Sequence, residues 1–327
     1  MSEGDVLTEP LYSHRKRPKW GLAILCGQQE DKREFQFQDG QQRVFKEGYW
    51  DMMQPVDQPL DRAQKIVREL KSMLRAARQR DASSGTVKKS GPPPISFEEQ
   101  LSYFRAKLFP EGLGGDSWKS KVRGEGIKKR RKRHREAAIA DAREKLGKDA
   151  IKALLAEENY TEVCKRLHSV LTASDLTASS DTAPLRKLPK EGEREVAEQL
   201  LDLLYGDGPF AARFDRFVTR LTALSGERVR WPMATAAPAL VSPTEQICIK
   251  PNVFREQARW MAPSFRYSPT PSGASYGRLL DVARAVERKL TEAGEPVRDL
   301  LDVFDFVHET LRPKVRSDIE TARGPAL

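Results

Sequence analysis

Two hydrophobic patterns divide the chain. Near the N-terminus, apolar and polar residues alternate over Glu34–Phe37 and again over Gln42–Phe45. Alternation with a period of two is typical of half-buried strands. The Asp39-Gly40 pair between these runs favours a tight hairpin turn, and the apolar run Trp20–Cys26 predicts a buried strand before them. Such short, closely spaced strands indicate a small curled sheet or barrel.

From about residue 60 the apolar spacing becomes that of helices. Ala63, Ile66, Val67 and Leu70 share one face of a predicted helix whose remaining positions are largely Arg and Lys. This amphipathic helix can pack on the sheet, pack on the following domain or lie along a partner, and packing is the default expectation. The stretch 81–94 is rich in Ser, Gly and Pro without periodicity, which predicts a linker.

The remainder of the chain is predicted to be mainly helical. Ser96-Phe97-Glu98-Glu99 has the sequence of a capping box at a helix start. Apolar residues then recur at helical spacing in several segments. These predicted helices cover residues 149–157, 160–171, 191–205, 209–224, 276–293 and 299–311. We expect a loop at 171–191 and an irregular region at 231–271 that contains a short strand at 246–251.

The strongest charge feature is the run Lys128–Arg135. Seven of its eight positions carry fixed positive charge, and the eighth is His134. The cations are Lys128, Lys129, Arg130, Arg131, Lys132, Arg133 and Arg135. An apolar helical stripe that ends at Leu146 follows directly. We therefore expect one helix over Ile127–Leu146, with a packed C-terminal half and an N-terminal half that stays in solvent or meets an anion.

Composition shows that this charge is local. The chain has 327 residues, and 57 Lys and Arg against 47 Asp and Glu give a net charge of +10. Since the run supplies +7, the rest of the chain carries only +3. A concentrated patch favours contact with a polyanion, most often nucleic acid. The alternative is a solvated charge run that only keeps the chain in solution.

Length and residue usage restrict the class of protein further. A chain of this length suggests two domains. Its mean hydropathy of −0.62 is polar for a globular protein, but 39% of its residues are hydrophobic, which is too many for a disordered chain. Cys26, Cys164 and Cys248 are far apart and odd in number, which predicts buried thiols in a reducing compartment. We find no signal peptide and no apolar run of about 18 residues, so a cytoplasmic protein without membrane contact is expected.

Few residues suggest catalysis. The four histidines lie in separate segments without HExxH spacing, and the Gly-rich stretch 109–118 lacks the Lys of a phosphate-binding loop. Asp299, Asp302 and Asp305 would share one helix face, where three carboxylates can hold a divalent metal but more often form a solvated or salt-bridged face. We predict no catalytic residue, no metal site and no cofactor.

A second set of cations is interleaved with aromatic residues. Lys250, Arg255, Arg259 and Arg266 lie near Trp260, Phe265 and Tyr267 in the sequence. Such a set can stack bases and hold phosphates, or it can be a helix–loop junction with cation–π packing. The sequence does not favour either interpretation.

The N-terminal segment resembles a known type of small barrel. The motif is Pro18-x-Trp20-Gly21-Leu22-Ala23 followed by Phe35-x-Phe37-x-Asp39-Gly40-x-x-Arg43-x-Phe45. It resembles the Tudor-like barrels of bacterial CarD-type proteins and of the C-terminal tail of UvrD-type helicases. The resemblance implies a barrel that contacts RNA polymerase or nucleic acid.

Within this segment we expect the aromatic residues to form the core, because a barrel this small needs them inside. The cations are the better contact candidates, although a solvated rim explains them equally well. They are Arg15, Lys16, Arg17, Lys19 and Arg43.

The rest of the chain is similar to a family of uncharacterised bacterial helical proteins. The motifs occur in a fixed order and include Trp231-Pro232-Met233-Ala234-Thr235, Lys250-Pro251-Asn252-Val253 and Asp299–Val307. The similarity implies a fold relationship and no activity. This chain departs from the pattern at Asp305, where a small polar residue is usual, and at Ser272–Ala274, where an aromatic residue is usual.

These observations predict an α+β protein. Residues 1–58 form a small Tudor-like β-barrel, 59–95 a basic helix and linker, and 96–327 a mainly α-helical domain. The leading hypothesis is a non-catalytic nucleic-acid-associated adaptor, whose barrel recruits RNA polymerase, a helicase or DNA while Lys128–Arg135 grips phosphates, with DNA preferred over RNA. One alternative is a metal-dependent nuclease or other enzyme of a bacterial defence or mobile-element system that uses the Asp299 cluster. Another is a protein scaffold whose basic run meets an acidic partner.

Overall fold

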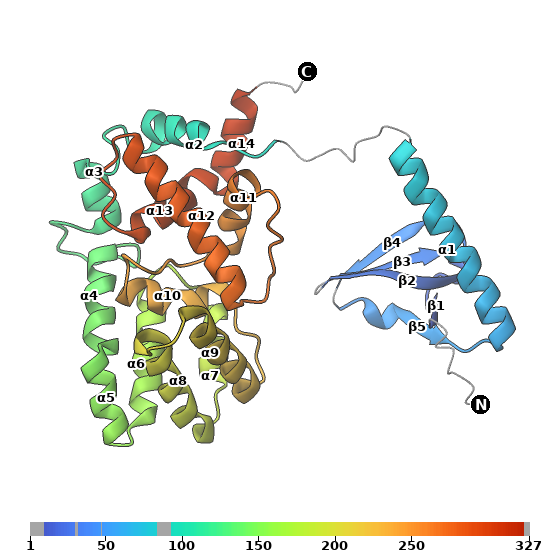
Figure 1. The fold of residues 1–327 in the computed structure, drawn as a ribbon, viewed down its shortest axis with the longest axis horizontal. Coiled ribbons are helices and arrows are strands. Elements are labelled where there is room, and N and C mark those ends of the chain that lie inside the picture. The colour runs from blue at the N-terminus through green and yellow to red at the C-terminus, as the bar shows by residue number, and fades with distance from the viewer. Residues whose placement is uncertain (1–9, 30–31, 47, 84–92, 324–327) are drawn as a thin grey trace. The chain divides into compact units, whose positions relative to one another are not determined.

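The computed structural model describes residues 10–29, 32–46, 48–83 and 93–323. The chain divides into two compact units, Met1–Gly91 and Pro92–Leu327, called here the sheet unit and the helical unit. An antiparallel sheet comes first and helices follow (Figure 1), so the α+β prediction is confirmed. Most of the predicted linker and the first nine residues lie outside the described residues.

The sheet unit contains five antiparallel strands. They are β1 (Leu11–His14), β2 (Leu22–Gln29), β3 (Lys32–Phe37), β4 (Gln42–Lys46) and β5 (Met53–Val56), in the order β4-β3-β2-β1-β5. Two short 3-10 turns, η1 (Pro18–Trp20) and η2 (Trp50–Met52), lie between strands. Because β4 and β5 do not pair with each other, the sheet is open, and the predicted closed barrel is not observed in the described residues. Local alternation predicts strands, but closure depends on pairing between distant strands.

Each face of the sheet has its own small core. On one face Leu11 and Ile24 pack against Ile66 and Leu70 of α1 (Leu60–Ser83), so the amphipathic helix covers the sheet. On the other face the buried residues are Ala23, Phe35, Phe37 and Met53, with Tyr12, Trp20, Leu25 and Phe45 partly buried against them. Several of the aromatic rings meet edge to face; Phe37 and Trp20, for example, have centroids 5.3 Å apart. Phe35 and Phe37 are thus core residues, as expected from the sequence.

The helical unit is built from many short helices around one core. Its α-helices are α2 (Phe97–Tyr103), α3 (Asp116–Trp118), α4 (Arg135–Leu146), α5 (Lys148–Ala156), α6 (Tyr160–Ala173), α7 (Ala183–Arg186), α8 (Glu193–Tyr205), α9 (Phe210–Ser225), α10 (Trp231–Val241), α11 (Pro251–Met261), α12 (Gly273–Glu292), α13 (Leu300–Leu311) and α14 (Pro313–Ala322). Single turns occur at η3 (Phe104–Leu108), η4 (Lys119–Arg123), η5 (Ser179–Thr182) and η6 (Lys190–Gly192), the first two of them π-helical. In Figure 1, α4 and α5 follow each other along one side, and α2, α13 and α14 lie at the end opposite α5 and α8.

The centre of this unit corrects the prediction of an irregular region at 231–271. Every residue of α10 is buried, and α11 follows it as a second helix. Pro232 lies in the first turn of α10, where no N–H is needed, and Pro238 is accommodated inside it by packing on all sides. The prolines therefore did not prevent helix formation, because a fully buried helix gains more from packing than it loses to propensity.

The predicted strand at 246–251 does not form. Residues 246–250 have no regular secondary structure and connect α10 to α11. Side chains there replace strand pairing: the hydroxyl of Thr235 accepts from the Ile249 N–H at 2.9 Å, and the hydroxyl of Tyr276 accepts from the Ile247 N–H at 3.0 Å. Buried backbone groups need partners, and two hydroxyls from α10 and α12 supply them. Burial raises the pKa of Tyr276, so its hydroxyl stays protonated.

The capping box at the start of α2 is confirmed. The Ser96 hydroxyl accepts from the Glu99 N–H at 3.2 Å, and the Glu99 carboxylate accepts from the Ser96 N–H at 2.8 Å. Arg323, just past α14, donates to both carboxylate oxygens of Glu99 at 2.6 Å. One carboxylate thus stabilises the start of α2 and attaches the C-terminal helix to it.

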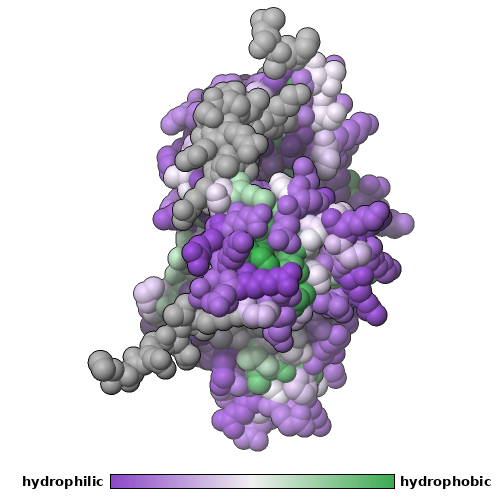
Figure 2. All heavy atoms as spheres, turned by 90° about the vertical axis from the view of Figure 1, so that its right-hand side faces the viewer, coloured by the Kyte–Doolittle hydropathy of each residue, from purple (hydrophilic) through white to green (hydrophobic). Residues whose placement is uncertain are grey.

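Most of the coloured surface in Figure 2 is hydrophilic, with hydrophobic residues visible only in small patches. None of the helices in the described part of the chain combines the length and apolar character needed to span a bilayer.

Replacing Glu99 with Gln tests the attachment of α14. The Arg323 side chain, helped by the Ser96 N–H, lowers the pKa of Glu99 to about 2 against burial. Since the folded pKa lies below the unfolded value, Glu99 stabilises the fold above about pH 4.5, and this is lost as the pH falls towards 2. Gln keeps the cap but not the charge, so the difference in unfolding free energy between wild type and Glu99→Gln should shrink over that range in denaturant titrations. A difference that is independent of pH would contradict this assignment.

Candidate nucleic-acid interface

Most of the predicted basic helix is a loop. Helix α4 begins at Arg135, with His134 as its N-cap, and residues 124–134 form turns outside the helix. The prediction of one helix over Ile127–Leu146 was therefore wrong for its first half, whereas the apolar half is confirmed. Like charges three and four residues apart destabilise a helix, and Gly124 and Gly126 adopt positive φ. We call residues 124–134 the basic loop.

The two ends of the basic loop meet at a neck. Gly124 has φ +82°, and a Cβ there would lie 2.6 Å from the Cβ of His134, so only glycine permits this approach. The His134 side chain is 4% exposed, and its Nδ1 accepts from the Arg131 N–H at 3.2 Å. In addition, the His134 N–H donates to the Arg131 carbonyl at 3.0 Å. The close approach of Gly124 to His134 brings the two ends of the loop together, and the bonds between Arg131 and His134 fix its C-terminal end.

A buried arginine anchors the chain before the neck. Arg123 ends η4 and is fully buried. Its Nη2 lies 2.8 Å from Asp299 and its Nε lies 3.0 Å from Asp302, both at the start of α13. Burial alone would lower the pKa of Arg123, but Asp302 and Asp299 outweigh it and raise the pKa. Trp118 also donates to Asp302 at 2.8 Å, which fixes the carboxylate.

A second buried arginine anchors the chain after the neck. Arg135 is 2% exposed and donates through Nε and Nη2 to both oxygens of Asp305, at 2.8 and 2.7 Å. Its Nη1 donates to Asp175 at 2.6 Å. Burial opposes the charge of Arg135, but Asp305 and then Asp175 raise its pKa. Arg135, predicted from the sequence to contact phosphates, is thus neutralised inside the protein and cannot meet an external phosphate.

Two further cations of the run have internal partners at the surface. Arg133 donates to Glu309 of α13 at 3.3 Å, and the Arg130 guanidinium lies 3.9 Å from Asp141. Their side chains are 40% and 42% exposed, so these pairs are weak and screened by solvent. Both residues remain reachable from outside.

The tip of the basic loop carries cations without internal partners. Lys128, Lys129, Arg131 and Lys132 are exposed, and in the described part of the chain their side chains form no ion pair. The Lys132 carbonyl accepts from the Asp175 N–H at 3.1 Å, which attaches the loop to the body beside Arg135. With Arg130, five consecutive exposed cations therefore project from a loop that is fixed at its base.

The N-terminal cations also include both exposed residues and a residue with partners inside the protein. Arg15, Lys16, Arg17 and Lys19 are exposed between β1 and β2. Arg43 instead donates to both oxygens of Asp39, at 2.9 and 2.7 Å, and its guanidinium lies 4.0 Å from the centre of the Trp20 ring. Arg43, predicted from the sequence to contact a partner, therefore binds Asp39 and Trp20 within the sheet unit, and the sequence did not predict these contacts.

The acidic cluster is an internal ion-pair seam. The side chains of Asp299, Asp302 and Asp305 face Arg123 and Arg135, and Asp299 also caps α13 by accepting from the Leu301 N–H at 2.9 Å. In the described residues, no group of three His, Cys, Asp or Glu side chains is arranged to hold a metal ion. The salt-bridged interpretation of this spacing therefore holds.

Several of the other candidates from the sequence have partners within the protein. Lys250 donates to the Asp175 carbonyl at 2.8 Å and lies over the Phe304 ring, and Arg259 pairs with Glu256 at 2.7 Å. Lys250 and Arg259 thus have partners within the protein, whereas Arg255 and Arg266 of the same set are exposed. Burial raises the pKa of Cys164 and of Cys248 to about 12, so neither thiol is an activated nucleophile.

Comparison with known proteins adds no relative: no family model, curated protein or solved structure matches this chain.

Asp305→Asn tests the anchor after the neck. It leaves Arg135 buried with only Asp175 as a charged partner, and breaking a buried pair typically costs about 3–5 kcal/mol. We expect a loss of this order in urea unfolding, whereas Asp281→Asn, an exposed change on α12, should stay within about 0.5 kcal/mol. Equal effects of the two substitutions would contradict the anchor.

The contribution of His134 at the neck to the stability of the fold should depend on pH. Burial, and then the charges of Arg131, Arg133 and Arg135, lower the pKa of His134 from 6.5. Because the folded pKa is depressed, the contribution of His134 to stability is complete above pH 6.5 and is lost as the pH falls towards the folded pKa. An NMR titration should give a midpoint below 6.5 for the imidazole signal that disappears in His134→Gln. A midpoint at or above 6.5 would show that the ring is not held neutral.

Proposed function

We propose that this protein is a non-catalytic, nucleic-acid-associated adaptor and that the basic loop contacts phosphates, with DNA preferred over RNA. The observation that carries the proposal is the row of five exposed cations, Lys128–Lys132, on a loop anchored by buried ion pairs. Neighbouring like charges repel one another, and binding of an external polyanion removes that cost.

The fixed base supports this proposal. A loop that is already ordered loses less conformational freedom on binding than a flexible tail would. The cations are not interleaved with aromatic side chains at the tip, since the sequence from 128 to 133 contains only Lys and Arg. Such a surface recognises the backbone charge of nucleic acid and carries no means of reading bases.

The sheet unit is the proposed recruiting module. Its strand order places β5 beside β1 and keeps the other strands in sequence, which is compatible with a Tudor-like sheet. The aromatic side chains on one face of this sheet pack against one another. RNA polymerase, a helicase or DNA remain the proposed partners. We do not extend the proposal to a nuclease, because Asp299, Asp302 and Asp305 are held by Arg123 and Arg135.

Salt dependence of DNA binding tests the basic loop. Each phosphate contact contributes about −0.9 to the slope of log affinity against log salt, so five contacts predict a slope of about −4.5 on duplex DNA. Replacing Lys128, Lys129, Arg131 and Lys132 with Gln should flatten the slope by about 3.6. Fluorescence anisotropy with a labelled duplex measures both values, and a double-stranded RNA of equal length tests the preference for DNA.

A matched control separates the loop from net charge. Lys148, Lys152, Lys165 and Lys190 are exposed elsewhere on the helical unit, and their replacement by Gln removes the same four charges. We expect that variant to keep most of the slope. If the loop variant binds DNA with an unchanged slope, the basic loop is not the contact.

A further inference from the structure

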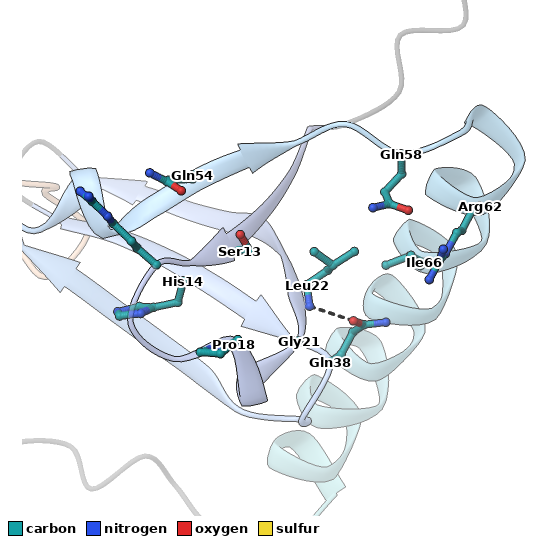
Figure 3. Close-up of a pocket in the computed structure, with 11 residues that line it drawn as sticks. Ser13, His14, Pro18, Gly21, Leu22, Gln38, Gln54, Gln58, Arg62 and Ile66 are labelled. Atoms are coloured by element: carbon teal, nitrogen blue, oxygen red, sulfur yellow. Dashed lines mark hydrogen bonds between the residues drawn. The ribbon is translucent and has the colours of Figure 1, made fainter.

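The sheet unit contains a pocket of about 500 Å³ between the sheet and the first turns of α1. Figure 3 shows Ser13 of β1, Leu22 of β2 and Gln54 of β5 on one side and Arg62 and Ile66 of α1 on the other, with Gln38 and Gln58 between them. These residues come from distant parts of the sequence, so the pocket exists only in the folded unit.

The lining of this pocket is positive. Arg15 and Arg62 line it, and no Asp or Glu does. Both arginines are exposed, and within the described residues neither side chain forms an ion pair. Asp57 and Asp61 are close in sequence to Gln58 and Arg62 but are exposed and do not line the pocket. Unpaired guanidinium groups are suited to bidentate binding of a carboxylate or phosphate.

The polar lining also contains an oriented donor. The Oε1 atom of Gln38 accepts from the Leu22 N–H at 2.8 Å, as the dashed line in Figure 3 shows. The amide is held there because Gly21 has φ +76° and no side chain; a Cβ would lie 2.8 Å from the Cβ of Gln38. Since the oxygen is engaged, the NH2 group of Gln38 is left to donate to a ligand.

The remaining lining favours a peptide over a nucleotide. Gln54, Gln58 and Ser13 offer amide and hydroxyl groups that match the donors and acceptors of a peptide backbone. Trp, Tyr and Phe do not line the pocket, and the one aromatic ring that does, His14, already packs on Trp20 with centroids 4.7 Å apart. A base therefore has no open ring on which to stack, in contrast to single-strand binding surfaces.

We propose that this pocket binds an acidic, Asp/Glu-rich peptide segment of a protein partner, with Arg15 and Arg62 pairing with carboxylates and the NH2 of Gln38 donating to the peptide. The proposal deepens the recruiting role proposed for the sheet unit, on which it rests, and it is independent of phosphate contact by the basic loop. Lys16, Arg17 and Lys19 follow Arg15 in the same exposed segment and extend the positive surface beyond the pocket.

The test uses the full-length chain with Lys128, Lys129, Arg131 and Lys132 replaced by Gln, so that the basic loop cannot capture the probe. A fluorescein-labelled hexaglutamate peptide is titrated and followed by anisotropy. Arg62→Gln is compared with Arg68→Gln, an equal charge change at an exposed position of α1 that does not line the pocket. Arg15→Gln repeats the test at the second arginine of the lining, and circular dichroism verifies folding.

We expect Arg62→Gln and Arg15→Gln to weaken peptide binding about three- to tenfold and Arg68→Gln to change it less than twofold. Absence of peptide binding, or equal losses in Arg62→Gln and Arg68→Gln, would overturn the proposal. If a single-stranded oligonucleotide competes at lower concentration than the unlabelled peptide and loses affinity in the same two variants, the pocket is a nucleic-acid site and the peptide assignment is wrong. The salt slope of the unmodified loop on DNA is measured separately, so either proposal can fail alone.

Discussion

The interaction on which the helical unit depends is the pairing of two buried arginines with the carboxylates of α13. Nearly every residue of α13 is buried, and this places Asp302 and Asp305 in the interior. An unpaired buried carboxylate costs several kcal/mol, so each needs a cation of suitable geometry. Arg123 and Arg135 meet that need from either side of the basic loop. The pairing therefore decides which part of the chain turns inward and which part is left outside.

The run of positive charge is consequently divided between the interior and the solvent. Its C-terminal end, Arg135, belongs to the interior, whereas Lys128–Lys132 remain in solvent on a loop closed by Gly124 and His134. The sheet unit repeats this division on a smaller scale, since Arg43 is used by Asp39 and Trp20 while Arg15 stays exposed. Within the described residues, Lys128, Lys129, Arg131 and Lys132 of the helical unit and Arg15 of the sheet unit are exposed and form no ion pair. They are the groups that contact anionic partners in the function proposed above.

Several elements followed from local patterns. The capping box at Ser96 and the apolar spacing of residues 160–171 and 209–224 correspond to α2, α6 and α9, because caps and helical faces depend only on residues a few positions apart. The prediction of an irregular region at 231–271 failed at α10, which contains Pro232 and Pro238. There the packing of a fully buried segment outweighed local propensity. Closure of the sheet was likewise beyond local patterning, since it requires pairing between the two edge strands, β4 and β5.

The amino-acid sequence by itself determined that an alternating N-terminal segment forms a sheet, that periodic segments form helices, and that positive charge is concentrated at 128–135. Only the tertiary structure decided which of those charges are available. Arg135 and Asp305 are 170 positions apart, and Arg123 and Asp302 are similarly distant. No spacing rule connects such pairs, because an ion pair depends on separation in space and on the exclusion of water, and both arise when the helices pack.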